Sequence, residues 1–241
     1  MKNILKLCGL LAIAFCNYAA SAQVTIKSND KSIRYDLIKN AHVFVKVTSF
    51  DTLGNVQYQF VNDNIIKTDS VNRQILFGRS RSIPFGHQYI DTSVTAYTGP
   101  LRYVMATNPM VKHLDVKFSP GQVQCSAIIK GVASNIGTTM PDGYFDDNIV
   151  EDLMGYLPIK KGIKYQLDAY RFESDKQLNH FEIEYVFDDI IRGSDGRNTI
   201  CSVLRFKNGY GNGYFWIDRS TRENIKEVIY IKSAVVLLET I

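Results

Sequence analysis

A two-residue alternation of apolar and polar side chains runs through most of the chain after residue 40. In residues 181–187, aromatic or aliphatic side chains occupy every odd position, whereas positions 182 and 184 are glutamates. Successive side chains of a β-strand point to opposite faces, so this pattern predicts strands with one buried face. It predicts further strands at about 42–50, 56–60, 74–79, 88–97, 101–107, 111–118, 122–132, 163–169 and 200–206. Turn residues such as Asp51–Asn55 separate these runs and favour an antiparallel meander.

One segment, near residues 147–155, has helical spacing instead. Its apolar residues at 149, 150, 153 and 154 fall on one side of a helix, and Asn148 is placed to cap its start. Leu157–Pro158 ends it, because proline cannot continue a helix. We expect this short helix to lie with its apolar side against the sheet.

Strands with one apolar face must bury that face against another layer. The sequence therefore predicts a mainly β fold in a single domain, residues 23–241, with two competing architectures. One is a sandwich of two sheets. The other is a curved antiparallel sheet, or half-open barrel, that wraps around the helix and leaves an apolar cavity on its concave side. Periodicity does not choose between them, and we expect the half-open barrel.

The first 22 residues have the features of a cleaved signal peptide. Lys2 and Lys6 precede an apolar run, residues 7–15, and Ala20-Ser21-Ala22 provides a cleavage site before Gln23. We expect export to the periplasm or the cell exterior, and no transmembrane segment in the mature chain. Lipidation at Cys16 is the less favoured alternative, because Phe15 occupies a position where lipoprotein processing needs a small residue.

Charge and cysteine content limit the function classes. Without Lys2 and Lys6, the mature chain has 26 basic and 24 acidic residues, a balance that gives no reason to expect nucleic acid as a partner. Cys125 and Cys201 are the cysteines that remain after cleavage. In an oxidising compartment they form either a disulfide or two buried thiols, and spacing leaves both open.

No cofactor or metal is expected. His42, His87, His113 and His180 show no ligand spacing, and no nucleophile motif is present. The acidic pair Asp146–Asp147 precedes the predicted helix, where carboxylates favour the positive end of the helix dipole.

Two segments resemble a known but uncharacterised family of exported proteins, the domain of unknown function 3108. Residues 157–165 are similar to the "LPL-K-x-G-Y" start of a strand in that family, and residues 215–222 are similar to its "W-x-D-K-x-T-R" strand and turn. Tyr144-Phe145-Asp146 also fits the family pattern. The resemblance covers about 140–231. Asp218, Thr221 and Arg222 have a structural explanation as a tight turn, with Trp216 in the core.

The family is distantly similar in fold to the carriers that ferry lipoproteins between membranes. The resemblance therefore implies a half-open barrel around a helix, an envelope location and the ability to hold a hydrophobic or lipid-like molecule. It brings no catalytic residues.

We therefore predict a non-enzymatic binding or envelope-maintenance protein with a hydrophobic small molecule or lipid as its ligand. The candidate lining residues recur on alternating positions beside the helix: Tyr165, Leu167, Phe181, Ile183, Tyr185, Leu204, Phe206 and Trp216. A second hypothesis is a structural or interaction domain with a fully packed core, which presents the turns 192–198 and 207–213 to an envelope protein. A third, less favoured, is an envelope hydrolase built on Asp146, Asp147 or His180.

Overall fold

The computed structural model describes residues 23–83, 87–107, 111–129, 131–171, 178–193 and 196–241. The predicted signal peptide, residues 1–22, and the predicted turn Asn108-Pro109 lie outside the described residues.

Most of the described chain is β-strand. The strands are β1 (Gln23–Thr25), β2 (Ala41–Phe50), β3 (Val56–Asp69), β4 (Gln74–Ile83), β5 (His87–Ala96), β6 (Gly99–Thr107), β7 (Val111–Ser119), β8 (Gln122–Ile129), β9 (Val132–Thr139), β10 (Phe145–Asp146), β11 (Lys164–Tyr170), β12 (Leu178–Arg192), β13 (Asn198–Lys207), β14 (Asn212–Asp218), β15 (Asn224–Ile231) and β16 (Ala234–Thr240). The helical segments are α2 (Val150–Leu153) and short 3-10 turns at Tyr35–Leu37, Asp147–Ile149 and Met154–Tyr156.

The described strands belong to one sheet that does not close into a barrel. Its order is β1-β11-β12-β13-β14-β15-β16-β2-β3-β4-β5-β6-β7-β8-β9, and β10 also pairs with β11. Two antiparallel meanders, β2 to β9 and β11 to β16, join where β16 pairs with β2. β1 and β10 run parallel to β11. The predicted curved antiparallel sheet with one short helix is confirmed, and the two-sheet sandwich is not the architecture.

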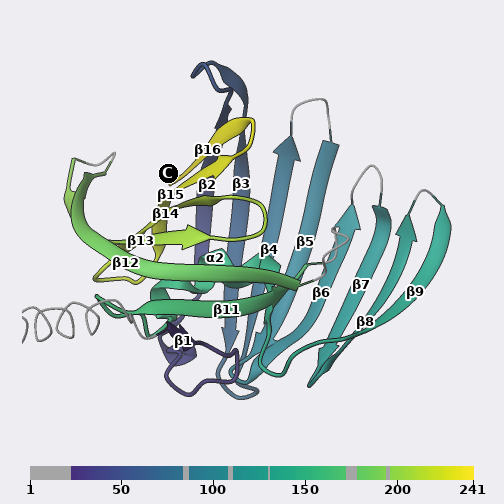
Figure 1. Cartoon of the computed structure of the whole chain (residues 1–241). Coiled ribbons are helices and arrows are strands. Elements are labelled where there is room, and N and C mark those ends of the chain that lie inside the picture. The colour runs from purple at the N-terminus through teal and green to yellow at the C-terminus, as the bar shows by residue number, and fades with distance from the viewer. Residues whose placement is uncertain (1–22, 84–86, 108–110, 130, 172–177, 194–195) are drawn as a thin grey trace, which may run out of the picture.

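The sheet curves around α2. Figure 1 shows the helix between the strands β11 to β13 and the long strands that begin with β2. One core cluster joins the two sides through the helix, because Leu153 and Met154 pack together with Phe181 of β12 and Phe77 of β4. A second cluster covers the inner side of β6 to β8 and includes Phe118 and Tyr170, whose rings meet edge to face.

The helix starts differently from the prediction. Asp146, not Asn148, is the capping residue: its Oδ1 accepts the backbone N–H of Asn148 at 3.0 Å and the Asn148 side-chain amide at 2.8 Å. The Asp146 backbone is extended, as a capping residue requires. The predicted strand 122–132 is also divided, because β8 ends at Ile129 and β9 returns from Val132 as its antiparallel partner.

The family-like segment at 215–222 forms a turn that holds the end of the helical segment. Oδ1 of Asp218 accepts the backbone N–H groups of Ser220 (2.7 Å) and Thr221 (3.3 Å), which confirms the predicted tight turn. Arg222, with φ +68°, donates from its guanidinium to the carbonyl oxygen of Gly155 at 3.2 Å. A Cβ on Gly155 would lie 1.7 Å from the Arg222 oxygen, so only glycine allows this approach.

Candidate functional site

Six of the eight predicted lining residues form one buried wall. Tyr165, Leu167, Phe181, Ile183, Leu204 and Phe206 are all at most 4% exposed and belong to a single core cluster. They lie on β11, β12 and β13, and the helix residues Leu153 and Met154 belong to the same cluster. Tyr185 is half-buried and packs against its edge. The structure therefore brings these residues together around the helix.

Trp216 does not lie with this wall. Its neighbours Phe215 and Ile217 on β14 are buried in the core, so Trp216 points to the opposite, convex face. There Nε1 donates to Oδ2 of Asp189 at 2.9 Å, and Nζ of Lys226 lies 5.2 Å from the ring centroid. The expectation that Trp216 fills the core is wrong, because the alternation of β14 places Phe215 there instead.

The three residues of the hydrolase hypothesis are not assembled into one site. Asp147 accepts hydrogen bonds from Arg171 (3.2 Å) and from Asn179 (2.9 Å). Asn179 and His180 are consecutive on β12, so His180 faces away from Asp147. There it is exposed and lies 2.6 Å from Oδ1 of Asp168.

Cys125 and Cys201 are free, buried thiols. Cys125 belongs to the cluster beneath β6 to β8, whereas Cys201 lies on β13. Burial raises the pKa of each thiol to about 11, so both are protonated at neutral pH.

The concave face carries polar residues that the pattern analysis did not identify. On β4, Arg79 and Arg81 continue the same face as Ile75 and Phe77, which are buried in the core. On β3, Asn62 and Asn64 share their face with Ile66, which packs against that core. In the sequence, each of these residues is a polar side chain at a position where the alternation predicts an apolar one. Considered one strand at a time, such a residue indicates the end of the buried stretch.

The polar side chains on the concave face meet helix α2 in a group that we call the interior charged cluster: Arg79, Arg81, Asp91, Glu151, Asp152 and Glu227. Nη2 of Arg79 lies 2.5 Å from Oδ2 of Asp152, and Nη2 of Arg81 lies 3.0 Å from Oδ2 of Asp91. Burial alone would lower the pKa of Arg79, but Asp152 and Asp91 raise it above its ordinary value.

Two carboxyl groups of the interior charged cluster have strongly altered acidity. Burial raises the pKa of Glu227 well above its usual range, and the carboxylates of Glu151 and Asp152 raise it further. Burial likewise raises the pKa of Glu151, against the opposing effect of Arg79. Glu227 is 2% exposed and shares its face of β15 with Ile229, which packs against the core. The interior of the fold thus holds two carboxyl groups that resist ionisation.

Several buried polar atoms in this region have no hydrogen-bond partner among the described residues. These atoms are Oδ1 of Asn62, Asn64 and Asn224, Oε1 of Glu227 and Nε of Arg81. A buried polar atom without a partner costs roughly 1–3 kcal/mol. Each atom of this kind in a folded protein calls for an explanation, such as a bound water or ion, local strain or a functional role.

The concave face opens to solvent along β3. Asn62 is 9% exposed, Phe60 is half-buried, and Tyr58 is 40% exposed. The Tyr58 and Phe60 rings stack with centroids 6.0 Å apart, so they share a face. Across β2, Val47 pairs with Phe60 and with Leu238 of β16, which continues this apolar inward surface. The exposure of the inward side chains of β3 therefore increases with distance from the interior charged cluster.

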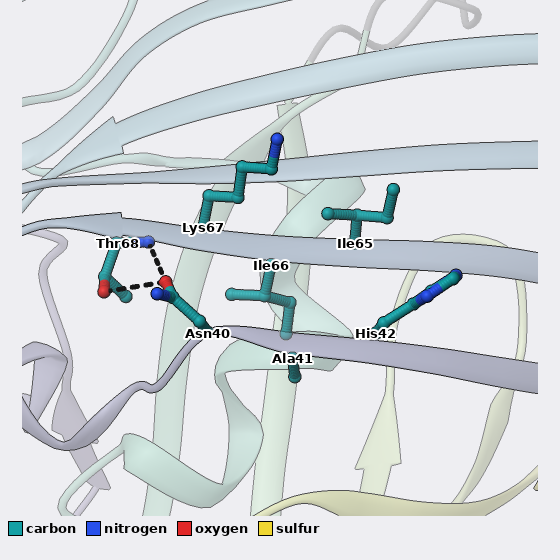
Figure 2. A pocket seen from close by; sticks show the side chains of 7 residues that line it. All are labelled: Asn40, Ala41, His42, Ile65, Ile66, Lys67 and Thr68. Carbon is teal, nitrogen blue, oxygen red and sulfur yellow. Dashed lines mark hydrogen bonds between the residues drawn. The ribbon is translucent and has the colours of Figure 1, made fainter.

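A depression of about 470 Å³ lies elsewhere, at the other end of β2 and β3 (Figure 2). His42 and Ile65 line it, and Asn40 is held there by two hydrogen bonds that its Oδ1 accepts from Thr68, at 2.7 Å and 3.0 Å. Its lining comes from both faces of the two strands, so it is an open notch in the surface rather than an interior site.

Within the described ranges, no group of three or more histidine, cysteine, aspartate or glutamate side chains is arranged to hold a metal ion. The same part of the chain contains no helix that is long and apolar enough to span a membrane.

Fold and interior together define a half-open β-barrel protein whose mainly apolar concave face includes a group of charged and polar side chains. The chain belongs to a family of unknown function, DUF3108, whose profile matches residues 44–238. The family resemblance seen in residues 140–231 is thereby confirmed. No curated protein matches the sequence.

Solved structures share the architecture at low sequence identity. A β-barrel-like protein of the domain of unknown function DUF1849 from Brucella abortus is 8% identical, with a TM-score of 0.56, over 85% of this chain and 96% of that one. The hypothetical lipoprotein YmcC from Escherichia coli (K12) is 10% identical over 82% of this chain and 86% of its own, with a TM-score of 0.35. The first similarity supports the fold alone.

Proposed function

We propose that this chain is an exported, non-enzymatic binding protein that holds an amphipathic, lipid-like molecule in its concave face. The apolar part of the ligand lies against inward side chains of β2, β3 and β16, and its polar part lies at the interior charged cluster. Export follows from the predicted signal peptide, residues 1–22.

The observation that carries this proposal is the set of buried, unpartnered polar atoms beside an apolar surface that opens to solvent. Oδ1 of Asn62 lacks a partner, and the next inward residues along β3 are the increasingly exposed Phe60 and Tyr58. A ligand with a polar end and an apolar end would satisfy the first group and cover the second. The buried wall of β11 to β13 serves this site as its packed support.

Titration of delipidated protein with a fatty acid, a phospholipid and a hydrophobic dye tests the proposal. We expect saturable binding of one amphiphile per chain. A matched pair of variants places the site: Phe60→Ala removes an inward ring, whereas Phe44→Ala removes an outward ring, 42% exposed, from the adjacent strand. Full burial of a phenylalanine ring is worth about 1.5–3 kcal/mol and Phe60 is already half-buried, so Phe60→Ala should weaken binding severalfold and Phe44→Ala should not. Absence of saturable binding to all three ligands would overturn the proposal.

A second candidate function rests on a different observation. Ile190 and Ile200 are register partners near the end of the β12–β13 hairpin, and they are 63% and 53% exposed. An exposed apolar pair of this kind favours contact with another protein. In this alternative the chain is an interaction domain, and a pull-down from envelope extract should lose its partner when both isoleucines are changed to serine.

A further inference from the structure

The interior charged cluster has more carboxyl groups than cations. Its two guanidinium groups already have carboxylate partners, since Arg79 pairs with Asp152 and Arg81 with Asp91. Glu151 and Glu227 form no ion pair with any described residue. Glu151 lies close enough to Glu227 for its carboxylate to raise the pKa of Glu227.

The unpartnered atoms show the same imbalance in hydrogen bonding. Oε1 of Glu227 and Oδ1 of Asn224, Asn62 and Asn64 are acceptors, whereas Nε of Arg81 is a donor. Glu227 is 98% buried and Asn62 is 91% buried, so solvent does not readily supply the missing donors. What the interior lacks is hydrogen-bond donors, together with a positive charge that would allow Glu151 and Glu227 to ionise.

An anionic head group fits this environment poorly. A carboxylate or a phosphate would add acceptors to a region that already has too many, and a negative charge beside Glu151 and Glu227. Among the unpartnered atoms, Nε of Arg81 alone could donate to it. A primary ammonium has three donors and a positive charge, and accepts nothing.

We propose that the polar end of the ligand is a primary ammonium group, which binds between Glu151 of α2 and Glu227 of β15. Asn62 and Asn64 on β3 accept hydrogen bonds from further donors near that end, such as a hydroxyl or an amide N–H. The ligand is thus an amino-lipid rather than a fatty acid or a phosphate-bearing lipid. This inference rests on the proposed function, because it names the chemistry of the ligand held in the same site.

Calorimetric titration of the delipidated full-length protein with four amphiphiles of equal chain length tests the inference: dodecylamine, dodecanol, dodecanoate and dodecyl phosphate, each below its micelle concentration. We expect dodecylamine to bind at least tenfold more tightly than the other three. Glu227→Gln should remove that preference. Glu239→Gln is the matched control, because Glu239 lies on the adjacent β16 opposite Lys226, on the convex face.

Each outcome has a distinct meaning. Tightest binding of dodecanoate or dodecyl phosphate would overturn the ammonium assignment and leave the proposed function standing. Preference for dodecylamine that survives in both Glu227→Gln and Glu151→Gln would overturn the location. No binding of any amphiphile would overturn the proposed function itself. Urea unfolding of each variant establishes that the folded protein is being titrated.

Discussion

Arg79 on β4 and Asp152 on α2 form an ion pair of 2.5 Å that attaches the helix to the concave face of the sheet. The two side chains are 14% and 24% exposed, and 73 residues separate them in the sequence. The helical segment is held at its other side by the hydrogen bond from Arg222 to Gly155. The helix therefore depends on polar contacts as well as on Leu153 and Met154.

Breaking this pair should destabilise the protein substantially. Arg79→Met leaves the partly buried Asp152 without its partner, and we expect the free energy of unfolding to fall by about 2–4 kcal/mol, somewhat less than for a fully buried pair. Urea unfolding of Arg79→Met, Asp152→Leu and the double variant should give a coupling energy above about 1 kcal/mol. Arg34→Met, at an exposed Arg34–Asp36 pair, is the control and should have no measurable effect. Equal effects at both sites would contradict the role of Arg79.

Glu227→Gln should stabilise the ligand-free protein. Folding raises the pKa of Glu227, so the folded protein binds this proton more tightly than the unfolded chain does. The free energy of unfolding of the wild type therefore falls as pH rises above 4.5, the pKa of glutamate in the unfolded chain. Glutamine does not titrate and keeps the shape. We expect a gain of about 1–3 kcal/mol at pH 8 and a smaller gain at pH 5. The exposed-face change Glu239→Gln should stay within about 0.5 kcal/mol, and a loss of stability in Glu227→Gln at pH 8 would refute the prediction.

Asp146 should contribute to the pH dependence of stability below neutrality. Burial raises its pKa from 3.8 to about 6, although Ser93 and the backbone N–H of Asn148 favour the charged form. At pH values between these two pKa values, the folded protein keeps a proton that the unfolded chain has lost. The free energy of unfolding therefore falls by about 3 kcal/mol as pH rises from about 4 to 7. Asp146→Asn keeps a capping residue and should remove that fall.

Asp115→Asn provides a control of opposite sign. Arg102 holds the pKa of Asp115 below its usual value, so the wild-type contribution of Asp115 is lost as pH falls. The two variants should change the pH profile in opposite directions, and identical profiles would exclude the assignment to Asp146.

Cys125 and Cys201 should react slowly with thiol reagents in the folded protein. Both are buried, and with pKa values of about 11 only about 0.1% of either thiol is ionised at pH 8. A maleimide should modify protein with Cys8 and Cys16 changed to serine only after urea is added. Rapid modification of two thiols without denaturant would show that the strands open readily, and failure to modify any thiol after unfolding would indicate a disulfide.

Strands were predictable where both the apolar and the polar positions followed the alternation. One such case is β12, where the buried Phe181 and Ile183 alternate with Glu182 and Glu184 as predicted. The helix near 147–155 was predictable from its spacing, although the capping residue is Asp146. The prediction for Trp216 was wrong, because the presence of aromatic residues does not show which of the two faces of a strand is buried.

The polar interior was not predictable from local pattern. Arg79, Asn62 and Glu227 occupy inward positions of strands whose other inward residues are apolar. A pattern method assigns such residues to solvent, since charged groups are seldom buried. Their environment depends on strands and a helix that are distant in sequence, and those contacts form only when β16 pairs with β2 and the sheet curves around α2.

The sequence by itself determined that this chain forms alternating strands interrupted by one short helix, because side-chain direction along a strand or helix is a local property of the backbone. Tertiary structure decided which face of each strand the helix covers and which charges meet beneath it. Pairs such as Arg79 and Asp152 interact over a few ångströms in space, and their separation along the chain carries no information about that distance.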